Sequence, residues 1–377
     1  MAKRVTLKEF QERVKELIQN AIIAGDYDEL VRTNQLTGLV NKICEQVTLD
    51  GNFVDKLPEL DAKELPYGSI IEEWYEGLVP VRKFSEVTGN EADVELSPAY
   101  PDYENPAYSE TMDRTYFKTS LTYDEYNSAV TSAEGLAKIT NMVVKRLYDS
   151  YAQYRYDCKK ELLGKAANLI YNEMTDVQSF ATGSAFGVGI VVTDGDGNNY
   201  MVRKSIEASN TKTLPELEAE GYVVKLDLSE VLAIPTDSTS GAAFIKAIKE
   251  KVEEASFATD GNSLAGNTIG AEDGLVLFIR KGVMPAVEVE TLAGAFNKDN
   301  LAIPAKVKVV EDFGADVDDS KCWAMLVDSR AIKLHPQYFR FGETQVNGGD
   351  YVNMFLHSKQ IGFISKFAFI HTWRTEE

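Results

Sequence analysis

The sequence predicts an α+β protein, and three observations support this fold class. Residues 132–176 contain no proline and carry apolar side chains at steps of three and four, which is the period of a helix. Residues 183–377 are rich in short strand-like runs separated by turn residues. Hydrophobic residues make up 44% and charged residues 26% of 377, close to globular averages, which excludes disordered, collagen-like and coiled-coil proteins.

Residues 1–65 predict a helical N-terminal arm. Apolar residues recur at helical spacing on both sides of Gly25, which indicates two amphipathic helices. Pro58 and Pro66 then bracket a short linker, after which the composition changes.

Residues 66–121 predict a long two-armed hairpin. The strand-like runs VPVRKF and RTYFKTSLT lie in its two arms. Residues 86–113, between them, hold eight Asp or Glu and no Lys or Arg, and Pro98, Pro101 and Pro106 exclude a helix there. So long a segment without a helix is unusual in a compact protein and is commonly functional. We therefore expect its acidic, proline-rich tip to reach toward a partner.

The helical period in residues 132–176 predicts one helix of about 44 residues, roughly 65 Å long. Gly164 is a candidate interruption. Few helices in globular proteins are this long, so we expect other layers to pack against it as a spine.

Residues 183–330 predict a mixed α/β domain. The turn sequence DGDGNN joins two strand-like runs, and an amphipathic helix surrounds Ile248. Beyond it we expect strands at GLVLFIRKG, KVKVVEDF and CWAMLVDS and a helix at VETLAGAFNKDN. In residues 331–377 we expect two aromatic-rich strands, separated by Lys359, Gln360 and Gly362.

The net charge of −20 argues against sequence-independent binding of DNA or of an anionic membrane, since both need clustered cations. The excess of Asp and Glu lies in residues 66–122 and 183–330. No apolar run is long enough for a membrane helix, and the charged start does not fit a signal peptide. Three separated cysteines fit neither a disulfide framework nor a metal site. We expect a protein made in the cytoplasm, without membrane or cofactor.

Signals for catalysis and metal binding are weak. His335, His357 and His371 are the only histidines, and the last two lie in aromatic runs that favour a structural role. Asp194 and Asp196 resemble the opening of a calcium loop, but the sixth position is not Gly and the twelfth is not Glu, so a plain turn is the better interpretation. The sequence nominates no catalytic and no metal-binding residue.

A carboxylate-based hydrolase stays open as an alternative. With 59 Asp and Glu many neighbouring pairs arise by chance, and glycosidase geometry cannot be derived from spacing. An enzyme would form a small soluble species with a deep pocket, whereas an assembly protein would form large particles.

The order of parts resembles the major capsid proteins of tailed double-stranded DNA bacteriophages, and more closely the coat proteins of small podoviruses with protein-primed genomes. Six segments carry this resemblance. They are residues 67–79 (YGSIIEEWYEGLV), 117–130, 273–297, 307–314, 322–334 and 353–373.

The resemblance implies an HK97-like phage capsid fold with five parts. They are a helical arm (1–65), an extended loop (66–121), a peripheral domain with the spine helix (122–182), an axial domain (183–330) and C-terminal strands of the peripheral domain (331–377).

The same resemblance implies a non-enzymatic coat protein of the virion. Its hexamers and pentamers would form an icosahedral head, assembled in the bacterial cytoplasm with a scaffolding protein and a portal, around double-stranded DNA that it does not recognise by sequence. An encapsulin-like compartment shell is the alternative within this fold. Contact candidates between subunits lie at the loop tip. They are Glu91, Asp93, Glu95, Tyr100, Asp102, Tyr103 and Glu104.

Overall fold

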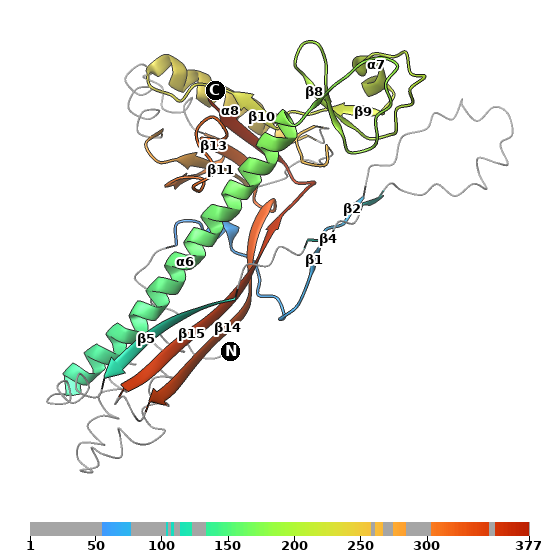
Figure 1. The fold of residues 1–377 in the computed structure, drawn as a ribbon. Coiled ribbons are helices and arrows are strands. Elements are labelled where there is room, and N and C mark those ends of the chain that lie inside the picture. Colours follow the sequence, from blue (N-terminus) through green and yellow to red (C-terminus); the bar gives the residue numbers. More distant parts are fainter. Residues whose placement is uncertain are drawn as a thin grey trace.

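A computed structural model of the chain has one long helix with sheets along it and at one end (Figure 1). The structure describes residues 55–76, 103–104, 107–108, 114–122, 133–257, 261–266, 274–283, 303–346 and 351–376. A three-stranded sheet follows the lower half of the helix in Figure 1, and two further sheets lie at its upper end. Within the described ranges, no helix is both long and apolar enough to cross a membrane.

Helix α6 (Ala133–Thr175) confirms the predicted spine. It runs unbroken for 43 residues and packs against strands of both the three-stranded and the five-stranded sheet. Gly164 does not interrupt it. A Cβ at this position would overlap the carbonyl oxygen of Phe313, so glycine is needed for the close approach of the loop that contains Phe313.

The three-stranded antiparallel sheet has the order β14 (Ile332–Val346), β15 (Tyr351–Ile364) and β5 (Thr115–Thr122). The side chains of Phe117 on β5 and Phe339 on β14 contact Tyr151 of α6. Since side chains alternate along a strand, the other set of positions faces away from the helix. Pro336 is tolerated inside β14 because the register shifts there, as at a β-bulge.

The predicted break at Lys359, Gln360 and Gly362 is wrong, although two strands do occur in this region, β15 and β16 (Ile370–Arg374). All three residues lie within the continuous strand β15. Lys359 lies on the face opposite the helix, and Gly362 packs so closely under Leu162 of α6 that a Cβ would come within 2.8 Å of it. Lys359 and Gly362 are thus compatible with a continuous strand, because the lysine faces away from α6 and the glycine allows the close approach of the helix.

A five-stranded sheet lies at the upper end of α6. Its order is β10 (Ser229–Val231), β16 (Ile370–Arg374), β13 (Ala324–Asp328), β11 (Leu275–Arg280) and β12 (Lys306–Val310). Asp237 caps the N-terminus of helix α8 (Ser238–Ala255). Phe244 of this helix packs against the rings of Trp323 and Trp373. The predicted strands and the helix around Ile248 are confirmed.

A four-stranded sheet with helix α7 (Leu214–Ala219) follows α6 in the sequence. Its order is β6 (Gln178–Ser179), β7 (Val191–Thr193), β8 (Asn199–Val202) and β9 (Val223–Lys225). Strands β7 and β8 pair antiparallel around the DGDGNN turn, which confirms the predicted hairpin.

The extended hairpin projects from the body on the right of Figure 1. Strand β1 (Ile71–Glu72) pairs with β4 (Ala107–Tyr108), and β2 (Tyr75–Glu76) pairs with β3 (Tyr103–Glu104), both antiparallel. The two arms are therefore confirmed in part, and the predicted run VPVRKF, residues 79–84, lies outside the described residues. RTYFKTSLT does not belong to them, because β5 pairs with β15. The short 3-10 helix η1 (Pro58–Leu60) precedes the hairpin.

Two predicted helical regions lie outside the described residues. They are the amphipathic helices of residues 10–43 and the helix VETLAGAFNKDN, residues 289–300.

Candidate functional site

The base of the extended hairpin presents three large apolar side chains to solvent. Tyr67, Ile70 and Trp74 are 62%, 63% and 68% exposed. They lie within eight residues of one arm, next to paired strands that carry the chain away from the body. Exposed aromatic and apolar groups gathered in one place are typical of a surface that binds another protein. This arm is the candidate functional site.

The contact residues predicted at the loop tip are placed only in part. Tyr103 and Glu104 form strand β3 and pair with Glu76 and Tyr75. The other five lie outside the described residues: Glu91, Asp93, Glu95, Tyr100 and Asp102. Tyr67, Ile70 and Trp74 were not among the predicted contact residues. The available signal was three large apolar residues, spaced by three and four positions, in the short segment that follows Pro66.

Polar contacts clamp the root of the hairpin to the corner between β15 and β16. The Glu73 carboxylate accepts a hydrogen bond from the Ser365 hydroxyl and another, of 3.1 Å, from the Lys366 backbone N–H. Gln337 donates its side-chain N–H to the Ser69 carbonyl at 3.0 Å. The root therefore has a defined direction relative to the two sheets that meet at this corner.

Tyr67 adds a ring contact to this root. Its ring lies edge-on to Tyr338 at a centroid distance of 5.9 Å. The Lys359 ammonium lies 4.7 Å from the centroid of Tyr67, within the range of a cation–π interaction. One part of the Tyr67 side chain thus joins the hairpin to the three-stranded sheet while the rest is exposed.

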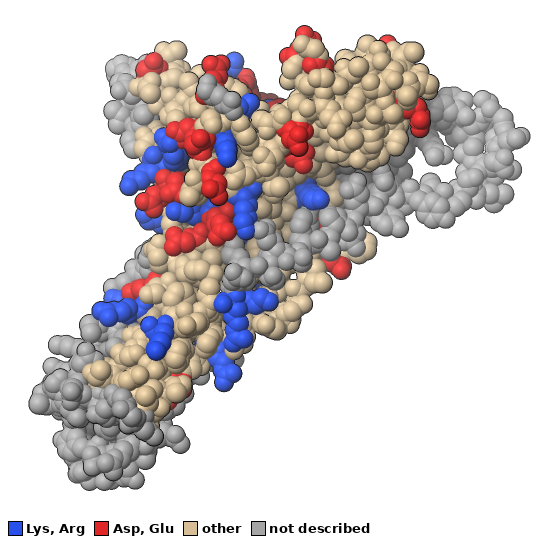
Figure 2. Space-filling model, in the orientation of Figure 1, with Lys and Arg blue, Asp and Glu red and all other residues tan. Residues whose placement is uncertain are grey.

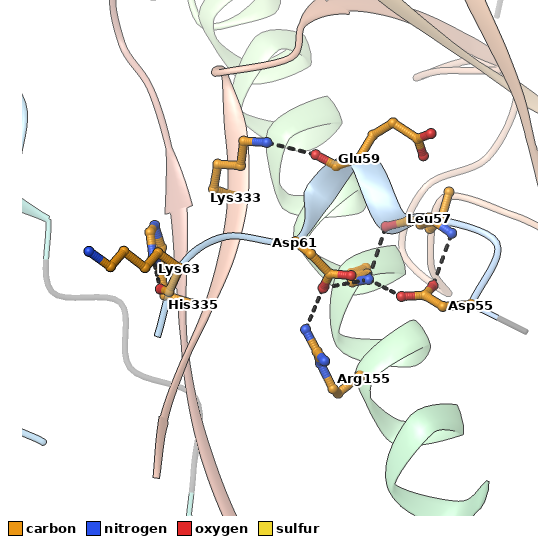
Figure 3. Close-up of polar contacts among 9 residues, drawn as sticks. Asp55, Leu57, Glu59, Asp61, Lys63, Arg155, Lys333 and His335 are labelled. Carbon is orange, nitrogen blue, oxygen red and sulfur yellow. Dashed lines mark hydrogen bonds and ion pairs between the residues drawn. The ribbon is translucent and has the colours of Figure 1, made fainter. Parts of the chain in front are cut away.

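A second anchor, shown in Figure 3, holds the chain just before the hairpin against α6. The Lys159 side chain is fully buried, and its ammonium donates to the Leu57 carbonyl at 2.9 Å. It also pairs with the carboxylates of Asp61, at 2.8 Å, and of Asp55. Arg155, one helical turn earlier, pairs with Asp61 too. We call Asp55, Asp61, Arg155 and Lys159 the arm anchor.

Apolar packing and further polar contacts support the arm anchor. Leu57 and Leu60 are buried in the core formed with the second half of α6. Lys333 of β14 donates to the Glu59 carbonyl at 2.7 Å, and the Glu59 carboxylate pairs with Lys306 and Lys308 of β12 (Figure 3 shows the first of these contacts). The segment is thereby attached to the helix and to both neighbouring sheets.

Electrostatics explain why these carboxylates stay ionised. Burial alone would raise the pKa of Asp55, but the hydrogen bonds from Lys159 and from the Leu57 N–H outweigh it and lower the pKa. Burial likewise opposes ionisation of Glu59, whose pKa is nevertheless lowered by Lys306 and Lys308. A buried charge without a partner is costly, so loss of either the cations or the carboxylates of the arm anchor would destabilise the charged groups that remain.

These carboxylates do not form a pair suited to hydrolysis. Asp55 and Asp61 share one buried ammonium ion, and the pKa of Asp55 is lowered by its hydrogen bonds, whereas a general acid needs a raised pKa. No group of three or more His, Cys, Asp or Glu side chains that could hold a metal ion occurs in the part of the chain that the structure describes. The Asp194 carboxylate instead accepts from the N–H groups of Asp196 and Asn198 and closes the turn.

The histidines have packing and hydrogen-bonding roles. Nδ1 of His335 lies 2.8 Å from the Lys63 carbonyl, and His357 stacks on Phe355. His371 is fully buried with Nδ1 3.1 Å from the Asp227 carbonyl, and burial lowers its pKa to about 4. The site is therefore a set of anchors and an exposed arm, which can position a protein partner.

Comparisons with known proteins agree with a structural role. A family model described as Phi29-like phage major capsid protein matches residues 3–373. The fold is similar to a chain in the capsid structure of Staphylococcus phage Andhra, with a TM-score of 0.54 and 10% identity over 84% of this chain and 83% of that one. No curated protein sequence matches.

A second solved structure is similar at the same level. It is that of the head fiber and inner core protein gp22 of native bacteriophage P68, in which one chain has a TM-score of 0.51 and 11% identity over 85% of each chain.

Proposed function

This chain belongs to the Phi29-like phage major capsid protein family, and from that premise we propose how it works: its copies form hexamers and pentamers that close into an icosahedral shell. We further propose that assembly takes place around a scaffolding protein, that a portal is incorporated, and that the shell encloses double-stranded DNA.

The family match makes the chain a major capsid protein, a structural component of the virion built from many copies. Its structure is an α+β fold of the HK97-like phage capsid type. Neither an encapsulin-like compartment nor a carboxylate-based hydrolase is supported by these matches.

The observation that carries the proposal is the match over residues 3–373, nearly the whole chain. The geometry supports it. A shell requires each copy to offer one patch to a different patch on the next copy, and a projecting arm on a rigid body is suited to such a contact. Here the arm is rooted at Glu73 and held by the arm anchor, and α6 supplies the rigid body.

The five parts implied by the resemblance are proposed as domains of the shell subunit. We assign residues 66–114 to the loop that reaches a neighbouring subunit, because the end of the expected range 66–121 lies in β5, which pairs with β15 in the three-stranded sheet. We assign residues 122–182 and 331–377 to a peripheral domain, and residues 183–330 to an axial domain at the centre of each capsomer. Strand β16 pairs with β10 and β13, so the last strand returns from the peripheral part into the axial sheet.

The net charge of the chain supports a shell that encloses DNA without binding it tightly. With a net charge of −20, the subunit as a whole repels the phosphate backbone. Such repulsion favours a genome that can be packed and later ejected.

Expression of the chain with and without its candidate scaffolding protein tests the proposal. We expect capsomers or closed particles in sizing chromatography and negative-stain microscopy when the scaffold is present. A solitary subunit under every condition, with turnover of a small molecule, would overturn it.

A further inference from the structure

A buried histidine lies between the five-stranded sheet and helix α8. His371 on β16 is fully buried. Trp373, two residues further along the strand, projects from the same face of the sheet, and its ring contacts Phe244 of α8. The imidazole lies edge-on to the Trp373 ring at a centroid distance of 4.9 Å. His371 therefore belongs to the layer in which α8 packs on the sheet.

The neutral His371 ring has one ring nitrogen that forms no hydrogen bond within the described residues. Nδ1 lies 3.1 Å from the Asp227 carbonyl oxygen, in the connection between β9 and β10. It also lies 3.7 Å from Oδ1 of the Asp227 carboxylate. Nε2 is buried and lacks a partner there. A second proton on the ring would create a buried positive charge, which is costly unless a carboxylate pairs with it.

The Asp227 carboxylate is already paired with a lysine of α8. The Lys251 ammonium forms ion pairs with Asp227 and with Glu254, the latter at 2.9 Å. Burial opposes the positive charge of Lys251, but its hydrogen bonds to the two carboxylates raise its pKa. Lys251 thus attaches the C-terminal half of α8 to the connection that also contacts His371.

The other elements around β16 add little charge near the imidazole. On β13 the register partner of His371 is Leu326, which carries no charge. The loop of residues 261–266 bonds to the backbone of β16 and contains no ionisable side chain. The charged groups that face this layer come from α8, from β10 and from the β9–β10 connection. They are Asp227, Glu230, Lys251 and Glu254.

Protons can reach this network from the surface. The side chains of Asp227 and Glu254 are 39% and 35% exposed, whereas that of Lys251 is 14% exposed and His371 is fully buried. Figure 2 shows both acidic and basic side chains on the surface at the end of the molecule that carries α8. The network therefore runs from solvent to the buried imidazole.

We propose that His371 is a pH-sensitive switch whose protonation releases the C-terminal half of α8 from the five-stranded sheet. The protonated imidazole competes with Lys251 for the Asp227 carboxylate, so the contact between α8 and the β9–β10 connection weakens. The inference does not rest on the proposed function, because it concerns a single subunit.

The direction of the pH effect follows from the surroundings of His371. Burial lowers its pKa to about 4 in the closed form, where the attraction of Asp227 is opposed by the repulsion of Lys251. Once α8 is released and the ring meets water, its pKa returns to the ordinary value of 6.5. The open form then binds more protons, so its population rises as the pH falls, by about 30-fold between pH 8 and pH 5.

Hydrogen exchange of the full-length, unassembled chain between pH 8 and pH 5 tests the switch, after correction for intrinsic exchange rates. We expect the protection of amides 248–255 to fall by about 30-fold over this range. At pH 5 these amides should be less protected than amides 160–170 of α6. Equal protection of the two segments at pH 5 would mean that the subunit opens as a whole, and it would overturn the local release.

The variant His371→Gln removes the titrating ring and should reduce the pH response of amides 248–255 to less than about threefold. The matched control His357→Gln removes a histidine of the three-stranded sheet and should keep the full response. A response of His371→Gln equal to that of the original chain would overturn the proposal.

Replacement of Lys251 gives a second, independent test, which also applies if His371→Gln does not fold. Lys251→Met frees Asp227 to pair with the protonated imidazole in the closed form, so the pH response should fall at least about twofold even though α8 is less protected at every pH. Lys251→Arg keeps the competing charge and should keep the response. Equal responses of Lys251→Met and Lys251→Arg would overturn the competition for Asp227.

Discussion

Lys159 is the residue on which the position of the arm depends most. Its ammonium is fully buried and lies among the carboxylates of Asp55 and Asp61 and the Leu57 carbonyl. A buried ion pair adds little stability relative to a well-packed apolar pair, but removal of one partner leaves the other charge without compensation. The arm anchor therefore specifies where residues 55–61 sit more than it strengthens the fold.

Replacement Lys159→Met should lower the free energy of unfolding of the unassembled subunit by about 3 kcal/mol, because two partly buried carboxylates lose their partner. Chemical denaturation measures it. The control Lys246→Met removes a lysine that is paired with Glu250 on the exposed surface of α8, and it should cost less than about 0.5 kcal/mol. Equal effects of the two replacements would contradict the role of the arm anchor.

His371 makes stability depend on pH. Burial lowers its pKa to about 4 in the folded chain from an ordinary value of 6.5, so the unfolded chain binds more protons between these two values. Its contribution is present above pH 6.5 and is lost as the pH falls toward 4. The stability gap between the original chain and His371→Gln should therefore narrow over this range, by roughly 3 kcal/mol at most.

Thermal or chemical unfolding between pH 7.5 and pH 4 checks this expectation. The control Phe369→Leu alters a buried neighbour that does not titrate, and its gap should stay constant with pH. A gap for His371→Gln that does not change with pH would contradict the buried, neutral imidazole.

At the scale of elements, local pattern predicted α6, α8 and strands β5, β7, β8, β11, β12 and β13. Apolar residues recur with the period of a helix in α6 and α8, burial alternates along β5, and β11 and β13 are continuous apolar runs that are buried almost throughout. Strand β15 was divided in error, since Lys359 and Gln360 were interpreted as a break. The sheet instead turns Lys359 outward and buries Gln360. Strand β14 was not predicted at all, as Pro336 is compatible with a strand only through its local register shift.

The candidate site was less predictable than the fold. The acidic tip was visible in composition, but the arm anchor joins Asp55 to Lys159 and the root joins Glu73 to Ser365, residues that are about a hundred or more positions apart. No local pattern indicates such pairs, because they exist only once the chain has folded. The exposure of Trp74 could not be predicted from local pattern either, because it depends on the hairpin leaving the body.

Replacement Trp74→Ala should reduce particle yield several-fold without changing the stability of the subunit. The side chain is 68% exposed, so truncation should alter the free energy of unfolding by less than about 0.5 kcal/mol. Exposed Trp residues at interfaces commonly contribute a large share of binding energy. Phe257→Ala, an exposed aromatic next to α8 and outside the hairpin, serves as control for both measurements. Normal particle yield from Trp74→Ala would remove this arm from the contact.

At the scale of the whole molecule, a 43-residue helix connects a three-stranded sheet at one end to two sheets at the other, and a hairpin projects from the side. This is a shape with several distinct surfaces that can meet other copies, as a closed shell of one protein requires. The anchors at Glu73 and Lys159 fix the hairpin to that body, so that its reach is the same in every copy.

If the projecting loop joins copies into a shell, removal of residues 86–98 should prevent assembly. A short Gly-Ser linker in their place spares all four described strands of the hairpin, which a deletion of residues 86–113 would not. The chain should be coexpressed with its scaffold and analysed by sedimentation velocity and negative-stain microscopy, with circular dichroism to verify folding. We expect a folded subunit that forms no closed particles. Closed particles at the yield of the full chain would contradict it.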